Sequence, residues 1–343
     1  MAEYGVLVHG AGWVSSEHIR AYQRNPHTEV VAISSRTRES AEQVREMTGA
    51  TGARIYTDYE QALADPDVHL VSICTPPNLH PRETILAAQA GKHILIEKAV
   101  ANTREELKAM VQAVRKAGVK TVVSFVLRWN PQFMCIKRLL EQNAIGRIFY
   151  AEVDYWHHIG PHYRQYEWNV KKEVARSSFL SAGCHAVDAI RYFVQDEIDE
   201  VMAYSNNTDP NYEYDTSVVS AVRFKGGAIG KLSSILDCRC PYAFNIDLLG
   251  TQGTLRDNRI WAKDLFPGQN DWITVPTIRP DSGDVTHHPF HGEIDHFVDC
   301  VRHNVESHVS LFDAAKTHEV IYAIDESAET GKPVKVLYEA SAV

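Results

Sequence analysis

The chain opens with an apolar strand that runs directly into a glycine-containing turn and then into a helical pattern. Residues 4–9 are β-forming, and Gly10-Ala11-Gly12 follow at once. Gly10 permits a tight turn, and Gly12 lets the backbone approach a pyrophosphate at the N-terminus of a helix. Ser15 occupies the place of the third glycine in this pattern. The order predicts a dinucleotide-binding βαβ unit, and the alternative is an ordinary turn between a strand and a helix.

Strands and helices alternate through the first third of the chain. Short apolar runs recur at intervals that leave room for a helix of about ten residues. These runs are 4–9, 29–33, 54–56, 68–74, 94–96 and 121–125. Such alternation is typical of a doubly wound, mostly parallel α/β sheet. We therefore predict a dinucleotide-binding Rossmann domain over residues 1–126.

The pattern changes after about Leu127. Most of the later β-patterned segments are separated by turns and not by helices: 148–155, 200–205, 217–223, 228–236, 243–249 and 253–256. Successive strands joined by turns favour an antiparallel sheet. Helical patterns over 292–304 and 311–330 close the chain. We predict a substrate-binding α+β domain over residues 127–343, with a mostly antiparallel sheet.

Charge and cysteine content narrow the functional classes. The formal net charge of −9 offers no basic surface for nucleic acid or an anionic membrane. The six cysteines lack the spacing of a disulfide framework or a zinc site, so free thiols in a reducing compartment are expected. The sequence shows no leader pattern and no apolar run long enough to cross a bilayer. We expect a cytoplasmic protein that acts on a small molecule.

The tip of the second strand bears on the choice of nicotinamide cofactor. An acidic residue at this place usually binds the ribose 2′-hydroxyl of NAD. This chain has Ser35, Arg36 and Arg38 there instead. A carboxylate would repel a 2′-phosphate, whereas arginine binds one well. The sequence therefore favours NADP slightly over NAD, unless both arginines are solvated residues that open the next helix.

Lys98 is the main catalytic candidate in the first domain. Ile94-Leu95-Ile96 form a buried strand that runs directly into Glu97 and Lys98. Ligands of open α/β sheets bind beyond the carboxyl ends of the strands, so Lys98 is expected in a cleft. A lysine placed there can transfer a proton or hold a hydroxyl group. The alternative is a solvated Glu-Lys pair at the end of a strand.

A helical stretch in the second domain carries another candidate. Ser181, His185 and Asp188 stand at i, i+4 and i+7 and share one face of this helix. A histidine in a polar cluster can serve as a general base. The alternative is a structural histidine whose tautomer Asp188 fixes.

Together these stretches resemble the oxidoreductase family typified by glucose–fructose oxidoreductase and inositol dehydrogenase. The resemblance spans essentially the whole chain and rests on an ordered set of motifs: Gly10-Ala11-Gly12, CTPPNLH at 74–80, Glu97-Lys98-Ala99, RWNP at 128–131 and GCHAVD at 183–188. It implies a Rossmann domain followed by a large open sheet, through whose far face the chain would form a homodimer or homotetramer. It also implies reversible hydride transfer between NAD or NADP and a ring hydroxyl of a sugar or cyclic polyol.

The resemblance gives the two catalytic candidates their roles. Lys98 would hold the reacting hydroxyl, and His185 would take its proton. Two positions depart from the family pattern: Ala99 replaces a proline, and Ser181 replaces an aspartate four residues before the histidine. Serine forms hydrogen bonds but supplies no negative charge, so the third catalytic member stays open.

The same resemblance indicates which residues would contact the ligands. Cofactor contacts are expected from Gly10, Gly12, Trp13, Val14, Ser35, Arg36, Arg38, Thr75, Pro76, Asn78, His80, Glu97, Lys98 and Arg128. Substrate contacts are expected from Lys98, Arg128, Trp129, Tyr155, His157, Trp168, Ser181 and His185. Aromatic faces with polar tips suit a carbohydrate. No acid or cysteine near His157, His158 and His162 completes a metal site, so no metal is predicted.

Three functions stay open at this point. The first is an NAD(P)-dependent dehydrogenase or reductase of a sugar, glycoside or cyclic polyol. The second is non-redox glycoside cleavage or elimination, in which a tightly bound cofactor oxidises the substrate transiently. The third is a sensor that binds nicotinamide and sugar without turnover, because a fold does not guarantee chemistry. The presence of both Lys98 and His185 disfavours the sensor.

Overall fold

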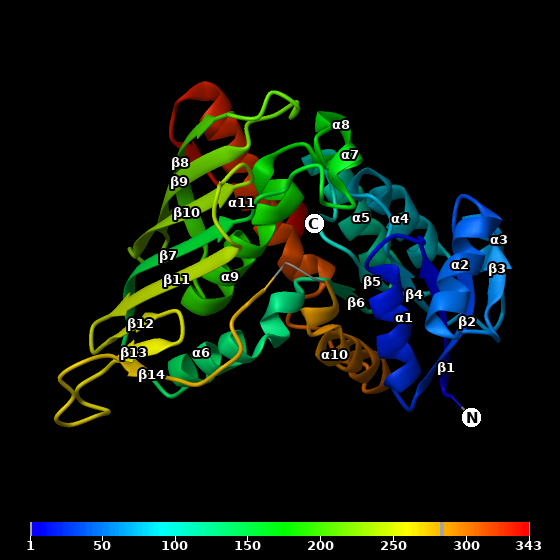
Figure 1. The fold of residues 1–343 in the computed structure, drawn as a ribbon, viewed down its shortest axis with the longest axis horizontal. Coiled ribbons are helices and arrows are strands. Elements are labelled where there is room, and N and C mark those ends of the chain that lie inside the picture. The colour runs from blue at the N-terminus through cyan, green and yellow to red at the C-terminus, as the bar shows by residue number, and fades with distance from the viewer. Residues whose placement is uncertain (1, 282–284, 343) are drawn as a thin grey trace. The chain divides into compact units, whose positions relative to one another are not determined.

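The computed structural model describes residues 2–281 and 285–342, and these divide into two compact units (Figure 1). The first unit contains residues 2–126, 289–316 and 339–342, and the second contains 127–281, 285–288 and 317–338. The sequence predicted one uninterrupted domain over 127–343. Residues 289–316 belong to the first unit instead, because α10 (Phe290–Arg302) packs its buried apolar face on α1 (Ser15–Arg24).

A six-stranded sheet forms the centre of the first unit. Its strands are β1 (Tyr4–His9), β2 (Thr28–Ser34), β3 (Arg54–Tyr56), β4 (Leu70–Ile73), β5 (His93–Ile96) and β6 (Thr121–Val123). They lie in the order β3-β2-β1-β4-β5-β6 and all pair in parallel, which confirms the predicted doubly wound α/β fold. The strand order reverses between β1 and β4, and the residues after these two strands therefore lie where ligands of such sheets bind.

Three helices of the first unit, α2 (Arg38–Thr48), α3 (Tyr59–Leu63) and α5 (Arg104–Ala117), begin at a side-chain cap. The unit also contains α1, α4 (His80–Gln89), α10 and the short α12 (Glu339–Ala342). Thr103 and Glu106 form a capping box at the start of α5, and Gly118, with a φ of +68°, ends it. Helices α1, α2 and α10 form one contacting group, and α4 and α5 form another.

A nine-stranded sheet dominates the second unit. Its order is β14-β13-β12-β11-β7-β10-β9-β8-β15, and among its described strands only β7 and β10 pair in parallel. The long strands are β7 (Ile148–Trp156), β8 (Ile198–Asn206), β9 (Ser217–Phe224), β10 (Ile229–Ile235) and β11 (Ala243–Gly250). The short ones are β12 (Thr254–Arg256), β13 (Arg259–Trp261), β14 (Ile273–Thr274) and β15 (Val334–Lys335). The predicted mostly antiparallel sheet is confirmed.

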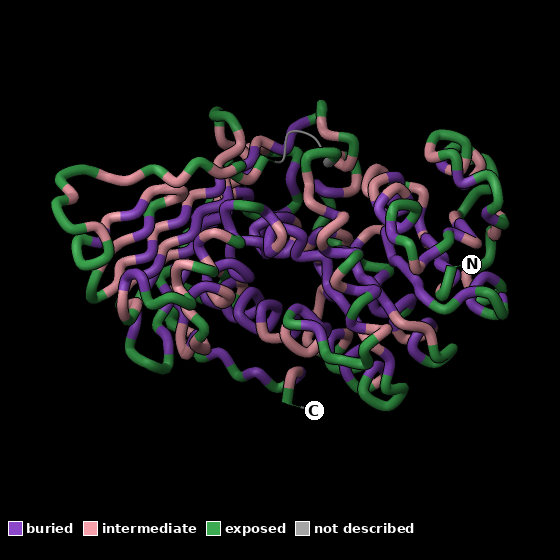
Figure 2. Tube along the Cα trace, turned by 90° about the horizontal axis from the view of Figure 1, so that it is seen from below, coloured by how far each residue is buried: buried purple, intermediate pink, exposed green. Residues whose placement is uncertain are grey.

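The two faces of this sheet differ in how far they are covered. On one face α9 (Cys184–Val194) packs on β7 and β10. Buried and more exposed residues alternate along β9, and Figure 2 shows this alternation along the strands. On the other face Tyr204, Val219 and Ile229 are 72%, 42% and 55% exposed. The remaining helices of this unit are α6 (Pro131–Glu141), α7 (Tyr166–Asn169), α8 (Lys172–Ala175) and most of α11 (Leu311–Thr330).

Candidate active site

The turn after β1 requires glycine at position 10. Gly10 has a φ of +103°, and a Cβ atom there would lie 2.6 Å from the carbonyl oxygen of Cys74. At Gly12 a Cβ atom would meet only that same oxygen, at 3.8 Å, so the backbone is open to a ligand. Ser15 is buried, and its hydroxyl donates to the carbonyl oxygen of Gly12 at 2.7 Å. Ser15 therefore holds the turn in shape, and Gly12 leaves room for a diphosphate.

The tip of β2 carries a bonded pair of serines and two exposed arginines. The hydroxyl oxygens of Ser35 and Ser40 lie 2.8 Å apart. Arg38 pairs with Glu42 at 3.5 Å on the exposed surface of α2. Arg36 is exposed, and within the described residues it forms no hydrogen bond or ion pair. Arg36 is thus better placed than Arg38 to meet an additional phosphate.

A buried carboxylate, Glu83 of α4, joins the ends of β1 and β4. It accepts a hydrogen bond from the Thr75 hydroxyl and lies 3.0 Å from Nε2 of His9. Burial would raise the pKa of Glu83, but His9 and Thr75 together hold that pKa below its usual value. The ring of Tyr59 stacks on His9 with 3.9 Å between centroids. These four side chains form a polar cluster at the carboxyl edge of the sheet, close to the glycine turn.

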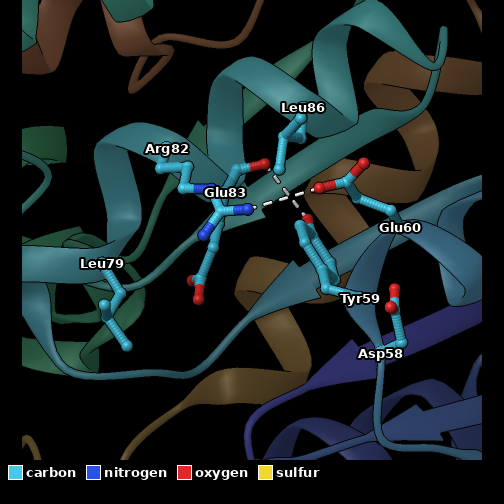
Figure 3. A pocket seen from close by; sticks show the side chains of 7 residues that line it. All are labelled: Asp58, Tyr59, Glu60, Leu79, Arg82, Glu83 and Leu86. Atoms are coloured by element: carbon cyan, nitrogen blue, oxygen red, sulfur yellow. Dashed lines mark hydrogen bonds and ion pairs between the residues drawn. The ribbon is translucent and has the colours of Figure 1, made fainter.

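A pocket of about 240 Å³ lies beside this cluster, between α3 and α4 (Figure 3). Its lining consists of Asp58, Tyr59, Glu60, Leu79, Arg82, Glu83 and Leu86. Arg82 and Glu60, both exposed, pair at 3.3 Å at its edge. The Tyr59 ring and the two leucines suit a flat heterocyclic base, whereas the three carboxylates disfavour a phosphate group.

His80 links two of the loops that follow the strands. It is buried, and its ring nitrogens lie 2.7 Å from the carbonyl oxygen of Ala99 and 2.8 Å from that of Thr75. This geometry ties the loop after β5 to the loop after β4 and gives His80 a structural role. Pro76 is half-buried and Asn78 is exposed, so the loop after β4 keeps surface for a ligand. Before α1, Trp13 and Val14 are also half-buried.

Lys98 follows β5, and its backbone is hydrogen-bonded to the buried carboxylate of Glu97. Its backbone nitrogen donates to Oε2 of Glu97 at 3.2 Å, and Oε1 of Glu97 lies 3.1 Å from Nε2 of His18. Burial alone would raise the pKa of Glu97, but the hydrogen bond and charge of His18 hold it below its usual value. Burial would likewise lower the pKa of His18, but Cys74 and Glu97 hold it well above the usual value. Glu97 is therefore a buried anion under Lys98, and the alternative of a solvated Glu-Lys pair does not describe it.

In the second unit, His185 lies beside a cluster of aromatic and histidine rings. The ring of Tyr155 lies nearly parallel to that of His185, with centroids 6.3 Å apart. The Tyr155 hydroxyl lies 3.0 Å from Nδ1 of His157. Tyr163 and Tyr242 meet the His157 ring edge-on, at 5.4 and 5.3 Å. The structure thus brings three of the predicted substrate residues together, and Tyr163 and Tyr242 join them without having been singled out in the sequence.

Arg128 and Asp188 form a buried, two-pronged ion pair. The guanidinium Nε and Nη2 atoms donate to the two carboxylate oxygens at 2.9 and 2.6 Å. The Arg128 guanidinium also lies over the ring of Tyr192, 4.7 Å from its centroid. Both Asp188 oxygens therefore bond Arg128, and the pair anchors the turn 126–129 to α9. Trp129, in that turn, is half-buried.

Ser181 lies in a π-helical turn, Phe179–Gly183, that precedes α9. The sequence predicted one continuous α-helix, and π-turns of this kind are often found at functional sites. The Ser181 hydroxyl donates to the side-chain oxygen of Asn169 at 2.5 Å. Asn169 is buried, and its carbonyl oxygen accepts from the Tyr214 hydroxyl at 2.6 Å. Asn169 directly follows the half-buried Trp168, but nothing in the sequence connects it to Ser181.

Lys98 belongs to the first unit and His185 to the second, and their convergence on one cleft stays a prediction. In residues 2–281 and 285–342, no three histidine, cysteine, aspartate or glutamate side chains are grouped so that they hold a metal ion. Over the same residues, no helix has the length and apolar character needed to span a bilayer.

Two sequence families match successive parts of the chain. Residues 4–125 match the family described as "Oxidoreductase family, NAD-binding Rossmann fold". Residues 133–256 match the "GFO/IDH/MocA C-terminal domain". The chain belongs to the Gfo/Idh/MocA family. The predicted resemblance is therefore confirmed, and the protein is an oxidoreductase with a nicotinamide-binding domain.

Relatives in the Gfo/Idh/MocA family bear the names of sugar and polyol dehydrogenases. Levoglucosan dehydrogenase of Pseudarthrobacter phenanthrenivorans is 28% identical over 289 residues, which cover 74% of this chain and 73% of the relative. The NAD(+)-dependent scyllo-inositol 2-dehydrogenase of Bacillus subtilis is 26% identical, over 91% of this chain and 90% of the relative. A solved levoglucosan dehydrogenase in complex with NADH has a TM-score of 0.88 at 24% identity, covers 97% of this chain and 99% of its own, and shows the same fold.

Proposed function

We propose that this protein transfers a hydride between a nicotinamide cofactor and a ring hydroxyl of a sugar, glycoside or cyclic polyol. The observation that carries the proposal is the ring cluster next to His185, in which the Tyr155 ring lies beside His185 and the Tyr155 hydroxyl lies 3.0 Å from Nδ1 of His157. Such a surface offers apolar faces with polar tips, as a sugar with C–H faces and hydroxyl groups requires. The names of the relatives, which are levoglucosan and inositol dehydrogenases, support the same substrate class.

The first unit fits a dinucleotide. Gly10 and Gly12 bring no side chain to the turn in front of α1, where a diphosphate would meet backbone N–H groups. When bound, the nicotinamide accepts or supplies the hydride. We further propose that NADP is accepted at least as well as NAD. Arg36 is exposed beside Ser35 and offers a cation to a 2′-phosphate, and no carboxylate stands at this tip to repel it.

Lys98 and His185 then have different roles at the substrate hydroxyl: Lys98 holds its oxygen and His185 takes its proton. In the oxidation, the C–H bond breaks with its electron pair leaving as hydride, the hydroxyl proton passes to His185, and a C=O bond forms. Hydride departs easily only as the proton is removed, so a base must stand at the hydroxyl. The Lys98 ammonium group donates a hydrogen bond to the same oxygen and stabilises the negative charge that develops on it. In the reduction, His185 returns the proton.

Replacement of the two residues tests this assignment. His185→Ala should lower kcat by roughly 10²–10⁴-fold, the usual contribution of a general base. Lys98→Ala should be at least as damaging, because it removes both a cation and a hydrogen-bond donor. The measurement is cofactor reduction by a panel of sugars and cyclic polyols, with circular dichroism to verify folding. Lys116→Ala and His303→Ala, at exposed positions on α5 and after α10, are matched controls and should retain full activity.

Two outcomes would contradict the proposal. Full activity in a folded Lys98→Ala or His185→Ala protein would remove that residue from the mechanism. If cofactor copurifies and every sugar and polyol leaves it unchanged at equilibrium while a glycoside is cleaved, the non-redox function replaces the dehydrogenase.

A further inference from the structure

Two buried acids and a buried histidine meet under the Lys98 peptide, and the dehydrogenase chemistry uses none of them directly. His18 comes from α1, Glu97 from the end of β5, and Glu293 from α10, so the group joins distant parts of the sequence. His18 and Glu293 are fully buried, and Glu97 is 7% exposed. Ionisable groups so far from water occur only when they are paired or neutral.

A chain of hydrogen bonds connects these groups to Lys98. Nδ1 of His18 lies 2.7 Å from the Ser72 hydroxyl, and its Nε2 lies 3.1 Å from Glu97. Glu97 accepts from the backbone nitrogen of Lys98 at 3.2 Å, and the ammonium charge of Lys98 also stabilises the Glu97 anion. One end of the cluster is therefore attached to the proposed catalytic lysine.

Glu293 lies at the other end of the cluster, and only one of its two carboxylate oxygens forms a hydrogen bond within the described residues. The Ser124 hydroxyl donates to its Oε2 atom at 3.0 Å, and Ser124 also interacts with Glu97. The backbone nitrogen of Ser124 donates to the carbonyl oxygen of Ile96, two residues before Lys98. Oε1 of Glu293 is buried and forms no hydrogen bond within the described residues. An ionised carboxylate oxygen without a partner costs more there than the neutral carboxyl group, because the desolvation penalty is larger for a charged group.

The charges of the cluster balance only if Glu293 keeps a proton. Among the buried groups, leaving aside the half-buried Lys98 ammonium, the His18 imidazolium and the Glu97 carboxylate already form a neutral pair. A second anion would be uncompensated, and burial together with the Glu97 charge raises the pKa of Glu293 to about 8, against the opposing effects of His18 and Ser124. The other titratable groups facing the cluster are Tyr22 of α1 and Cys74 after β4. The Phe290 ring of α10 packs on His18, with centroids 4.8 Å apart.

We propose that Glu293 is a positioning residue for Lys98: as a neutral acid it keeps Glu97 ionised and bonded to the Lys98 peptide. This proposal rests on the proposed function, in which Lys98 holds the substrate hydroxyl. Loss of the Glu293 proton places two anions on either side of Ser124. Their repulsion is relieved by displacement of Glu97 or by its protonation, and either change releases Lys98. Catalysis therefore declines as Glu293 ionises.

The test compares pH profiles of Glu293→Gln and the wild-type enzyme. Glutamine keeps the shape and the Ser124 hydrogen bond but cannot ionise. Wild-type kcat should fall through an alkaline transition near pH 8, and Glu293→Gln should lack this transition while binding NADH or NADPH normally. Glu293→Ala should lower kcat by roughly 10–100-fold at all pH values with little change in KM, since small misplacements of reacting groups cost that much. Asp299→Asn, at an exposed acid on the same helix, is the matched control and should keep the wild-type profile.

Two further measurements guard against a variant that is merely unstable. Ser124→Ala removes a hydrogen bond that favours the ionised Glu293, so its alkaline transition should move to higher pH. For an acid whose pKa is raised on folding, stability is fully present below the unfolded pKa and is lost as pH rises to the folded pKa. The Tm of the wild type should therefore fall relative to that of Glu293→Gln between roughly pH 4.5 and 8.

The outcomes separate the two proposals. If Lys98→Ala is inactive and Glu293→Gln still shows the wild-type alkaline transition, Glu293 has no positioning role and the proposed function stands. If folded Lys98→Ala is fully active, the proposed function fails and the positioning role fails with it, whatever the Glu293 profile.

Discussion

Arg36 and Arg38 stand two residues apart at the tip of β2, but their surroundings differ. Arg38 lies at the first position of α2 and pairs with Glu42 one turn later, whereas Arg36 is exposed before the helix begins. Exposed pairs of this kind contribute little to stability, typically below ~1 kcal/mol. The pairing nevertheless neutralises Arg38 locally. Arg36 is therefore the residue on which a preference for NADP should depend.

Replacement of Arg36 tests this preference. Arg36→Ala should lower kcat/KM for NADP(H) by roughly 10–100-fold, because a hydrogen bond to a charged group contributes about 1.5–3 kcal/mol. The kcat/KM for NAD(H) should stay nearly constant, and Arg38→Ala should have the smaller effect with either cofactor. Steady-state kinetics with both cofactors decide the matter. A strong preference for NAD(H) that neither substitution changes would show that both arginines face solvent in the complex.

At the scale of elements, the Arg128–Asp188 pair fastens the turn 126–129 to α9, which carries His185. The pair is almost fully buried, so loss of one partner leaves the other charge without compensation. Arg128→Ala or Asp188→Ala should therefore lower the free energy of unfolding by about 3–5 kcal/mol. Urea-induced unfolding measures this loss.

A double substitution separates anchoring from ligand binding. Arg128→Met with Asp188→Leu removes both charges and fills the space, so it should recover most of the lost stability. Arg128 was also predicted to contact cofactor and substrate. If Arg128→Ala leaves the unfolding free energy unchanged but raises KM for either ligand, the residue serves binding and not the anchor.

Features that depend on residues close together in the sequence could be predicted from it. The glycine turn at Gly10 and Gly12, the strand before Lys98 and the α/β alternation all follow from neighbouring residues, and they appear in the structure where expected. The side-chain pairings of the site could not be predicted in this way. Glu293 reaches Ser124 across 169 positions and Asp188 reaches Arg128 across 60. Such partners are selected by tertiary packing, which leaves no repeat in the sequence.

The π-turn before α9 illustrates the same limit over a shorter range. Ser181, His185 and Asp188 have helical spacing, and the sequence therefore predicted one polar face that they share. In the structure each has its own identified neighbour: Asn169 for Ser181, Tyr155 for His185, and Arg128 for Asp188. The predicted continuous α-helix is wrong at Ser181, which lies in the π-turn. The spacing also did not reveal these neighbours, because each one comes from another element.

At the scale of the whole molecule, we propose that the open face of the nine-stranded sheet joins copies of this chain. Tyr204 and Val219 are directly opposite each other on β8 and β9 and are largely exposed, and Ile229 of β10 lies on the same face. Exposed apolar side chains gathered on one sheet face are typical of a protein interface. This exposed surface and the family resemblance support the proposal.

Charged substitutions on that face test the assembly. Tyr204→Glu with Val219→Glu should convert a dimer or tetramer into a monomer, because the new carboxylates would be buried without partners at the interface. Light scattering coupled to size-exclusion chromatography gives the mass. Met47→Glu, at an exposed apolar residue of α2 in the other unit, is the control and should leave the mass unchanged. A wild-type protein that is monomeric at micromolar concentration would refute the interface.

Because α10 belongs to the first unit but lies late in the sequence, the first unit cannot complete its packing early in synthesis. Ribosomal synthesis runs from the N-terminus, and domains generally fold as they emerge. The nucleotide-binding sheet is complete once Val123 has been synthesised, but its buried helix α10 begins only at Phe290. Until then the α1 surface around His18 has no cover. The apolar surface of α1 in the nascent first unit therefore stays exposed while nearly all of the second unit is synthesised. Chaperones can bind this surface during that interval.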